Sequence, residues 1–363
     1  MKTTRRNFTK TISTIGLNSL IMGNQDLFGA PKKKLGIALV GLGYYSTDLL
    51  APALQLTEFA ELKGIVTGSP AKIPIWKAKY GIEDKNIYNY QNFDEIAKNP
   101  DIDIVYVVLP PSMHREYVER AAKAGKHVFC EKPMAPSVAD CRAMIKACEK
   151  AKVKLAIGYR CQHDPNIQAY RKITRDKKFG KVVEVTSKAA YRENRTNHWK
   201  QIKALGGGVM GDMGVYAIQG ARMAVGMEPI AVSAIASTTR PEIYKEVEET
   251  VNYTLEFPDG IKATCLSSFG ENVNSLEIKY EKGWVKMSPQ SSYSGNKGEA
   301  SDGTKIDFPL KNQQTKQIDD DCLAIMNKKP LQATGYEGLN DIIIVEAIYK
   351  SAAQGGKRVI IED

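Results

Sequence analysis

Short β-rich apolar runs alternate with helical stretches between residues 35 and 158, and this alternation constrains the fold more than any other feature of the sequence. Strands separated by helices form βαβ units, because parallel neighbours need a crossover connection. The alternation therefore predicts a parallel sheet with helices on both faces. The predicted strands are 35–40, 60–67, 102–109, 127–130 and 154–157, with helices such as 112–124 and 137–151 between them.

The pattern changes after Tyr159, where longer strands follow one another at 182–190, 230–237, 247–257, 261–269, 275–280 and 284–287. Turn sequences at 258–260 and 281–283 lie between neighbouring strands and are typical of hairpins. We expect helices at 165–177, 206–225 and 337–353, and a Ser- and Gly-rich surface loop at 288–304. The predicted fold class is α/β plus α+β, with a parallel-sheet domain at 31–158 and a mostly antiparallel sheet domain at 159–363.

Composition and charge exclude several classes of protein. The 363 residues are 43% hydrophobic and 25% charged, as in ordinary globular proteins. No run approaches the roughly 20 apolar residues of a membrane span. The net charge of +10 is spread among acidic residues, without a basic stripe or a nucleic-acid-binding motif, so we expect no nucleic-acid partner. The six cysteines lack zinc-type spacing, which predicts small core residues and no metal site.

The first thirty residues have the character of a targeting segment. Thr4-Arg5-Arg6-Asn7-Phe8-Thr9-Lys10 precedes a weakly apolar stretch at 11–23. This arrangement resembles a twin-arginine signal, which exports folded proteins to the bacterial periplasm. We therefore predict a signal peptide at 1–30 and a periplasmic protein; the alternative is a basic N-terminus of no targeting function.

A glycine-rich loop follows the first predicted strand. The loop is Gly41-Leu42-Gly43-Tyr44-Tyr45-Ser46, a G-x-G-x-x-S pattern that leads into a helix. Glycines at the first two positions permit a tight turn and let backbone N–H groups approach a pyrophosphate at the helix N-terminus. Because this loop opens a βαβ unit, it predicts a Rossmann-type dinucleotide-binding domain.

The end of the second predicted strand bears on which dinucleotide is bound. NAD-preferring sites place Asp or Glu there, to hold the ribose 2′-hydroxyl group. Glu61 instead begins this strand, whereas Thr67, Gly68, Ser69 and Lys72 follow its end. Hydroxyl groups and a cation suit a 2′-phosphate, so we predict NADP as the cofactor and consider NAD less favoured.

Two further segments carry candidate chemistry. Lys132 directly follows the predicted strand 127–130, at the sheet edge where open α/β folds bind ligands. Asp212 and Tyr216 are four residues apart in a glycine-rich segment, so they share one face of a helix. The residues alone leave other interpretations open: Lys132 as a surface charge, Asp212 as a helix cap and Tyr216 as a packing anchor.

Several ordered motifs resemble those of the glucose-fructose oxidoreductase, inositol dehydrogenase and rhizopine-catabolism (Gfo/Idh/MocA) family, and within it the periplasmic glucose-fructose oxidoreductase branch. They are G-L-G-x-Y at 41–45, C-E-K-P-M-A at 130–135, S-V-A-D-C at 137–141, G-Y-R-C-x-x-D-P at 158–165 and G-G-G-x-x-x-D-x-G-x-Y at 206–216. The resemblance extends over nearly all of residues 35–362.

The resemblance implies an NADP-dependent sugar oxidoreductase. Carried over by position, it implies that Tyr216 is the general acid/base, Lys132 its electrostatic partner and Asp212 the orienting carboxylate. Lys132 could instead carry the proton. We expect Tyr159, His163 and Trp199 to contact the substrate as well, although Trp199 could equally be a loop anchor. We assign these residues to the cofactor: Gly41, Leu42, Gly43, Tyr44, Tyr45, Thr67, Gly68, Ser69, Lys72, Leu109, Pro110, His114, Glu131, Lys132 and Arg160.

The chain also departs from that branch. A long Pro-rich arm precedes the first strand in the glucose-fructose enzyme, but only Pro31-Lys32-Lys33-Lys34 stands here. We therefore do not carry over cofactor retention by arm exchange, nor the coupled oxidation of one sugar and reduction of another. The loop 192–205 also differs in composition from that enzyme, so the substrate is left open among sugars and polyols. A redox-assisted glycosidase of the same wider family is the alternative activity. We expect a homo-oligomer, a dimer or a tetramer.

Overall fold

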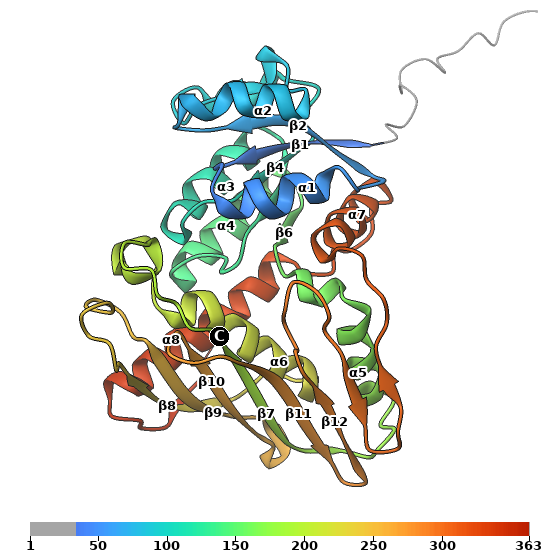
Figure 1. Ribbon diagram of the computed structural model, residues 1–363, viewed down its shortest axis with the longest axis vertical. Helices are drawn as coiled ribbons and strands as arrows, with labels where there is room; N and C mark the ends of the chain where they lie inside the picture. The colour runs from blue at the N-terminus through green and yellow to red at the C-terminus, as the bar shows by residue number, and fades with distance from the viewer. Residues whose placement is uncertain (1–33, 363) are drawn as a thin grey trace, which may run out of the picture. The chain divides into compact units, whose positions relative to one another are not determined.

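The computed structural model describes residues 34–362, and these form one compact unit. The predicted signal peptide, with Arg5 and Arg6, lies outside the described residues. Two sheets organise the unit, one of six strands and one of nine (Figure 1). The predicted combination of a parallel and a mostly antiparallel sheet is confirmed.

The six-stranded sheet has the order β3-β2-β1-β4-β5-β6, and every neighbouring pair is parallel. Ile37 and Leu39 of β1 enter one core, whereas Ala38 and Val40 enter the core on the opposite face. Burial on both faces explains why the strands are almost continuously apolar. The strands are β1 (Leu35–Val40), β2 (Ala60–Val66), β3 (Ile87–Tyr88), β4 (Ile104–Val107), β5 (His127–Cys130) and β6 (Leu155–Ile157). Only β3 is absent from the sequence prediction, because two residues give no periodic signal.

Helices connect these parallel strands. They are α1 (Ala51–Leu54), α2 (Ile73–Tyr80), α3 (His114–Lys123) and α4 (Val138–Ala151). Ser137 caps α4 by accepting a hydrogen bond from the N–H group of Asp140. Because every crossover returns the chain to the same edge of the sheet, the loops after β1, β2, β4 and β5 gather at the carboxyl ends of the strands.

The nine-stranded sheet has the order β14-β13-β12-β11-β7-β10-β9-β8-β15. Its pairs are antiparallel except β7 with β10, which run parallel. The predicted turns at 258–260 and 281–283 do join hairpin strands. The strands are β7 (Val182–Ala190), β8 (Ala231–Ser237), β9 (Thr250–Glu256), β10 (Lys262–Ser268), β11 (Val273–Tyr280), β12 (Gly283–Met287), β13 (Gly298–Ala300), β14 (Lys305–Ile306) and β15 (Val359–Ile360).

Three helices pack against this sheet: α5 (Pro165–Arg175), α6 (Val215–Val225) and α8 (Gly335–Ala353) (Figure 1). A fourth helix, α7 (Gln313–Met326), is missing from the sequence prediction. We call the part built around the six-stranded sheet the first lobe and the part built around the nine-stranded sheet the second lobe. The helix α7 packs on the first lobe, where Asp319 accepts the N–H groups of Glu58 (3.0 Å) and Phe59 (2.9 Å). One helix of the predicted second domain, α7, therefore packs against the first domain.

Two other observations bear on the sequence predictions. All six cysteines are buried and free, which confirms that they are core residues. Within residues 34–362, no helix has the length and apolar character needed to cross a membrane.

Candidate active site

The glycine loop after β1 has the geometry of a phosphate cradle. Gly41 has a φ of +90°, and a Cβ atom there would lie 2.4 Å from the carbonyl oxygen of Val108. At Gly43 a Cβ atom would meet no heavy atom within 4 Å, so the backbone faces open space. The hydroxyl of Ser46 donates to the carbonyl of Gly41 (2.5 Å), and helical residues begin at Tyr45. A dinucleotide pyrophosphate fits this arrangement of exposed backbone and helix N-terminus.

The predicted NADP-selecting residues lie beside this loop. The Lys72 ammonium group donates to the carbonyl of Leu42 at 2.5 Å, which ties the segment after β2 to the glycine loop. The Thr67 hydroxyl accepts the N–H group of Ser69 (3.0 Å), and Gly68 is exposed between them. Glu61 begins β2, where it pairs with Lys63 (3.1 Å). The carboxyl end of β2 is therefore a hydroxyl-rich and cationic environment.

Lys132 and Asp212 meet across the two lobes. Lys132 follows β5, and its ammonium group donates to Asp212 Oδ1 (2.9 Å) and to the Asp212 carbonyl (3.0 Å). Asp212 stands on a helical turn at Met210–Gly214 that leads directly into α6. The side chains are only 13% and 10% exposed, so the ion pair is largely shielded from solvent.

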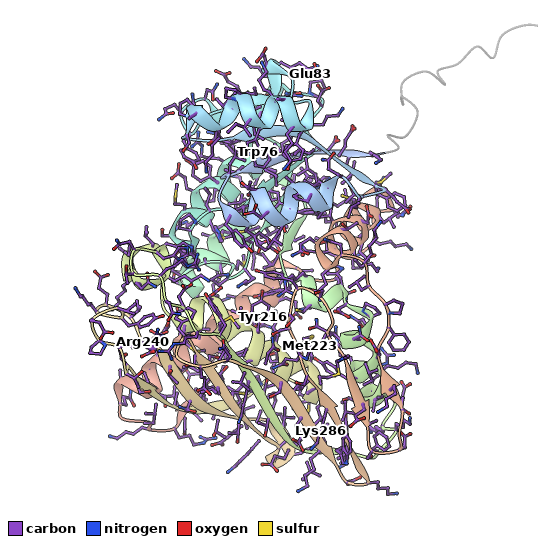
Figure 2. All side chains as sticks on the ribbon, in the orientation of Figure 1. Trp76, Glu83, Tyr216, Met223, Arg240 and Lys286 are labelled. Carbon is purple, nitrogen blue, oxygen red and sulfur yellow. The ribbon has the colours of Figure 1, made fainter. Side chains whose placement is uncertain are left out.

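Tyr216 completes this group at the start of α6 (Figure 2). Its ring packs against the cores of both lobes. The Lys132 ammonium group lies 4.5 Å from the centre of the ring, and the Arg160 guanidinium group donates to the Tyr216 hydroxyl (3.3 Å). The structure thus brings Lys132, Asp212 and Tyr216 together, but Arg160 and not Lys132 contacts the phenol oxygen.

Arg160 is held by a segment whose role the sequence analysis misjudged. The buried guanidinium group donates to the carbonyls of Ser291 (2.8 Å) and Ser292 (2.9 Å) and to the side chain of Gln313. The ring of Tyr293 lies 4.3 Å from the same group. The predicted surface loop at 288–304 is correct only in part, because this stretch contains β13 and its residues 291–293 contact Arg160. Ser and Gly predict irregular backbone, but they give no signal of what that backbone contacts.

A second group, whose contacts the sequence does not predict, lies on the opposite side of Asp212. The Lys200 ammonium group donates to Asp212 Oδ2 (2.5 Å) and to the Tyr191 hydroxyl (2.6 Å). Tyr191 follows β7 directly, and Lys200 lies in the loop before the glycine-rich turn. The sequence signal for Tyr191 is a position after a strand end, which many surface residues share, and that for Lys200 is a position shortly before the glycine-rich segment.

The charges of this cluster fix its protonation. Although burial acts in the opposite direction, the ammonium groups of Lys132 and Lys200 hold the pKa of Asp212 far below its usual range. Burial likewise opposes protonation of Lys132, but the Asp212 carboxylate keeps the Lys132 pKa well above its usual value. Both groups therefore remain charged throughout the physiological pH range.

Two predicted cofactor residues, His114 and Glu131, are buried beside the segment that carries Lys132. The imidazole of His114 is buried, with its ring nitrogens near the carbonyls of Leu109 (2.8 Å) and Pro133 (3.1 Å). The Glu131 carboxylate accepts the hydroxyl of Tyr106 (2.7 Å), and burial raises the pKa of Glu131 to about 7. Both side chains are therefore buried and make hydrogen bonds within the protein, where they stabilise the carboxyl edge of the parallel sheet.

The other predicted residues are scattered more widely. Tyr44 is 64% exposed, Leu109, Pro110 and Tyr45 are half-buried, and the Tyr45 ring lies 6.2 Å from that of Tyr293. Trp199 is half-buried beside His198, so it stays near the cluster. The structure does not place Tyr159 or His163 in the cluster: both are sealed in the interior, and His163 Nδ1 faces Asp320 (3.0 Å).

A glycine cradle on a parallel sheet, and a Lys–Asp–Tyr group whose lysine follows a strand of that sheet and whose Asp and Tyr come from the second lobe, define a dinucleotide-dependent oxidoreductase. Residues 35–159 match the model of the GFO_IDH_MocA oxidoreductase family, NAD-binding Rossmann fold, and residues 167–286 match the GFO/IDH/MocA C-terminal domain. The chain belongs to the Gfo/Idh/MocA family of oxidoreductases.

Similar proteins act on sugars and polyols. The crystal structure of aldose-aldose oxidoreductase from Caulobacter crescentus, complexed with glycerol, is 40% identical, covers 90% of this chain and 99% of its own, and has a TM-score of 0.87. D-xylose 1-dehydrogenase [NADP(+)] of Haloarcula marismortui is 24% identical over 87% of this chain and 90% of its own length. Inositol 2-dehydrogenase of Rhizobium meliloti is 27% identical over 84% and 93%.

Proposed function

We propose that this protein transfers a hydride between NADP(H) and a hydroxyl or carbonyl carbon of a sugar or polyol. The observation that carries the proposal is the meeting of Lys132, Asp212 and Tyr216 at the carboxyl edge of the sheet that bears the glycine loop. The sugar- and polyol-active relatives support the substrate class, and the aldose-aldose oxidoreductase supports the predicted glucose-fructose oxidoreductase-like activity.

The residues divide the chemistry among them. Bound NADP(H) supplies the hydride acceptor or donor. Tyr216 takes the proton of the substrate hydroxyl during oxidation and returns it during reduction. Lys132 stays protonated beside Asp212, so it stabilises negative charge on the substrate oxygen and on Tyr216. Arg160 donates a hydrogen bond to the Tyr216 hydroxyl and so keeps it in position.

The direct experiment starts from purified protein. Denaturation followed by chromatography identifies any dinucleotide that is released. The holoenzyme is then assayed with aldoses, ketoses and polyols by nicotinamide absorbance, with and without a second sugar as acceptor. Oxidation of at least one such substrate is the expected result; a protein that binds dinucleotide and turns over no member of these classes would contradict the proposal.

The preference for NADP rests on the segment after β2. Lys72 is the cation closest to the glycine loop in that segment, so we expect Lys72→Ala to weaken NADP binding about 10- to 100-fold, the effect of losing one charge-assisted contact. NAD lacks the 2′-phosphate, so its affinity should change much less. Calorimetric titration with both cofactors measures the difference, and Lys79→Ala, on the neighbouring helix α2, is the matched control. Equal losses of affinity for NADP and NAD would instead mean that Lys72 only supports the glycine loop and does not recognise the 2′-phosphate.

One comparison favours the alternative activity. A relative that is 29% identical over 71% of this chain and 68% of its own length is 2,7-anhydro-N-acetylneuraminate hydratase of Escherichia coli. A hydratase makes no net redox change, so the family fold also supports other outcomes. Release of the aryl group from aryl glycosides, without net change in nicotinamide absorbance, would favour the redox-assisted glycosidase.

We also propose periplasmic export and self-association. Export rests on the twin-arginine pattern at 4–10. Fractionation of cells that express the full chain tests it, with Arg5 and Arg6 changed to Lys as the control.

Self-association draws support from large apolar side chains that the second sheet leaves exposed, such as Val183 (47%) and Ile235 (51%). Sedimentation analysis distinguishes monomer, dimer and tetramer.

A further inference from the structure

The loop between β7 and α6 delivers a second lysine to the catalytic carboxylate. The Lys200 ammonium group donates to Asp212 Oδ2 (2.5 Å), whereas Lys132 donates to Oδ1 (2.9 Å). Each oxygen of Asp212 therefore has an ammonium partner of its own. Lys200 is only 14% exposed at its side chain, almost as shielded as Lys132 at 13%.

Hydrogen bonds fix the backbone that carries Lys200. The imidazole of His198 accepts the N–H group of Lys200 (3.4 Å), and the Gln201 side chain accepts the N–H group of His198 (2.8 Å) and donates to the Arg195 carbonyl (2.8 Å). The Lys200 carbonyl accepts the N–H group of Gly208 (2.9 Å), in the glycine-rich segment before Asp212. The loop is thus tied to the segment whose carboxylate it contacts.

Beyond Lys200 the charges continue to alternate. The Tyr191 hydroxyl accepts from Lys200 (2.6 Å), donates to Glu193 (2.9 Å) and lies 3.3 Å from Asp212 Oδ2. Glu193 pairs in turn with Arg195, which keeps the pKa of Glu193 low, at about 2, in spite of burial. Along the chain of contacts from Lys132 through Asp212, Lys200, Tyr191 and Glu193 to Arg195, no two groups of like charge are direct neighbours. This chain of contacts therefore forms a network of charge-assisted hydrogen bonds, which are stronger than neutral ones.

We propose that Lys200 is a positioning residue: it holds Oδ2 of Asp212, so that Oδ1 alone pairs with Lys132 and the Lys132 ammonium group stays over the ring of Tyr216. This inference rests on the proposed function. Without Lys200, nothing charged would restrain Oδ2 except Lys132 itself. The carboxylate could then turn and take Lys132 bidentately, away from the position 4.5 Å from the Tyr216 ring.

The test is the variant Lys200→Met, assayed as holoenzyme with the sugar or polyol that the wild type oxidises. We expect kcat to fall about 10- to 100-fold, the effect of losing one hydrogen bond between charged groups, with little change in the KM of the cofactor. Lys203→Met is the matched control, since Lys203 is exposed in the same loop and its side chain is outside this network. Lys200→Arg keeps the charge and should recover part of the loss.

A pH profile separates positioning from a general loss of structure. Asp212 must be ionised to orient Lys132, and in the wild type two ammonium groups lower its pKa against burial. With one of them removed, the Asp212 pKa should rise toward its ordinary value, so the acid limb of kcat/KM should lie at higher pH than in the wild type. The other titratable groups that act on Asp212 are Tyr191, Tyr293 and His198, and all of them remain in the variant.

The outcomes are distinct. A lowered kcat with a shifted acid limb, in a variant that unfolds at the wild-type temperature, supports the inference. An unshifted acid limb, or an unchanged kcat, overturns it. If Lys200→Met unfolds early, Tyr191→Phe removes the neighbouring hydroxyl and should shift the same limb by a smaller amount; no shift there also counts against the inference. Failure of the wild type to turn over any sugar or polyol contradicts the proposed function instead.

Discussion

Tyr216→Phe is expected to lose about 10²- to 10⁴-fold in turnover while it binds the cofactor as the wild type does. The variant keeps the ring that packs between the two cores and that the Lys132 ammonium group faces at 4.5 Å. It removes only the hydroxyl that Arg160 contacts and that takes the substrate proton in the proposed mechanism. Steady-state assays with the identified substrate, together with calorimetric titration of the cofactor, measure both properties.

Tyr80→Phe is the matched control for this variant. Tyr80 ends α2, and its buried hydroxyl has no hydrogen-bond partner among the described residues. Removing that hydroxyl should leave turnover unchanged. If Tyr216→Phe turned over at close to the wild-type rate, Tyr216 would not be the general acid/base and Lys132 would become the candidate.

Lys132→Met is expected to lower kcat about 10²- to 10³-fold, in the range for removal of one charged group that stabilises the transition state. Methionine has a similar length and fills the same space, but it donates no hydrogen bond. The substrate oxygen then loses the cation that the proposed mechanism assigns to it, and Asp212 loses the partner of Oδ1. Lys200 alone would then oppose the effect of burial on Asp212, so the Asp212 pKa should rise and the acid limb of kcat/KM should also move to higher pH.

Two comparisons make the result for Lys132 decisive. Lys123→Met removes an exposed lysine from α3 in the same lobe and should have no effect. The double variant Lys132→Met, Tyr216→Phe should lose much less than the sum of the two single effects, because residues that act as a unit are not additive. Full additivity would mean that Lys132 and Tyr216 act independently, contrary to the proposed division of roles.

Much of the molecule could be predicted from local patterns. The β1 run and the glycines after it define a strand, a turn and a helix within about a dozen residues, so no distant contact is needed to recognise them. The strand β7 matches its predicted range of 182–190 for the same reason. The family motifs around Lys132 and Asp212 also indicated that both segments carry chemistry, although not what each side chain would contact.

The errors concern segments whose structure depends on a partner. The helix α7 is polar over most of its length and buries only a narrow stripe, including Ile318 and Cys322, against the first lobe. Its stretch 313–317 consists entirely of polar residues, so periodicity gives a weak signal. In the same way, Ser291, Ser292 and Tyr293 gain their importance only because Arg160 lies beneath them.

By itself the sequence determined most of the strands and helices of the parallel sheet, the cradle at Gly41 and Gly43, and which residues are candidates for the reaction centre, since each depends on neighbours along the chain. Only the tertiary structure decided which charges meet. Asp212 lies 80 residues from Lys132 and 12 from Lys200, yet both ammonium groups contact its carboxylate. Electrostatic interactions depend on the distance between charges in space and on the exclusion of water, and the separation of two residues along the sequence predicts neither.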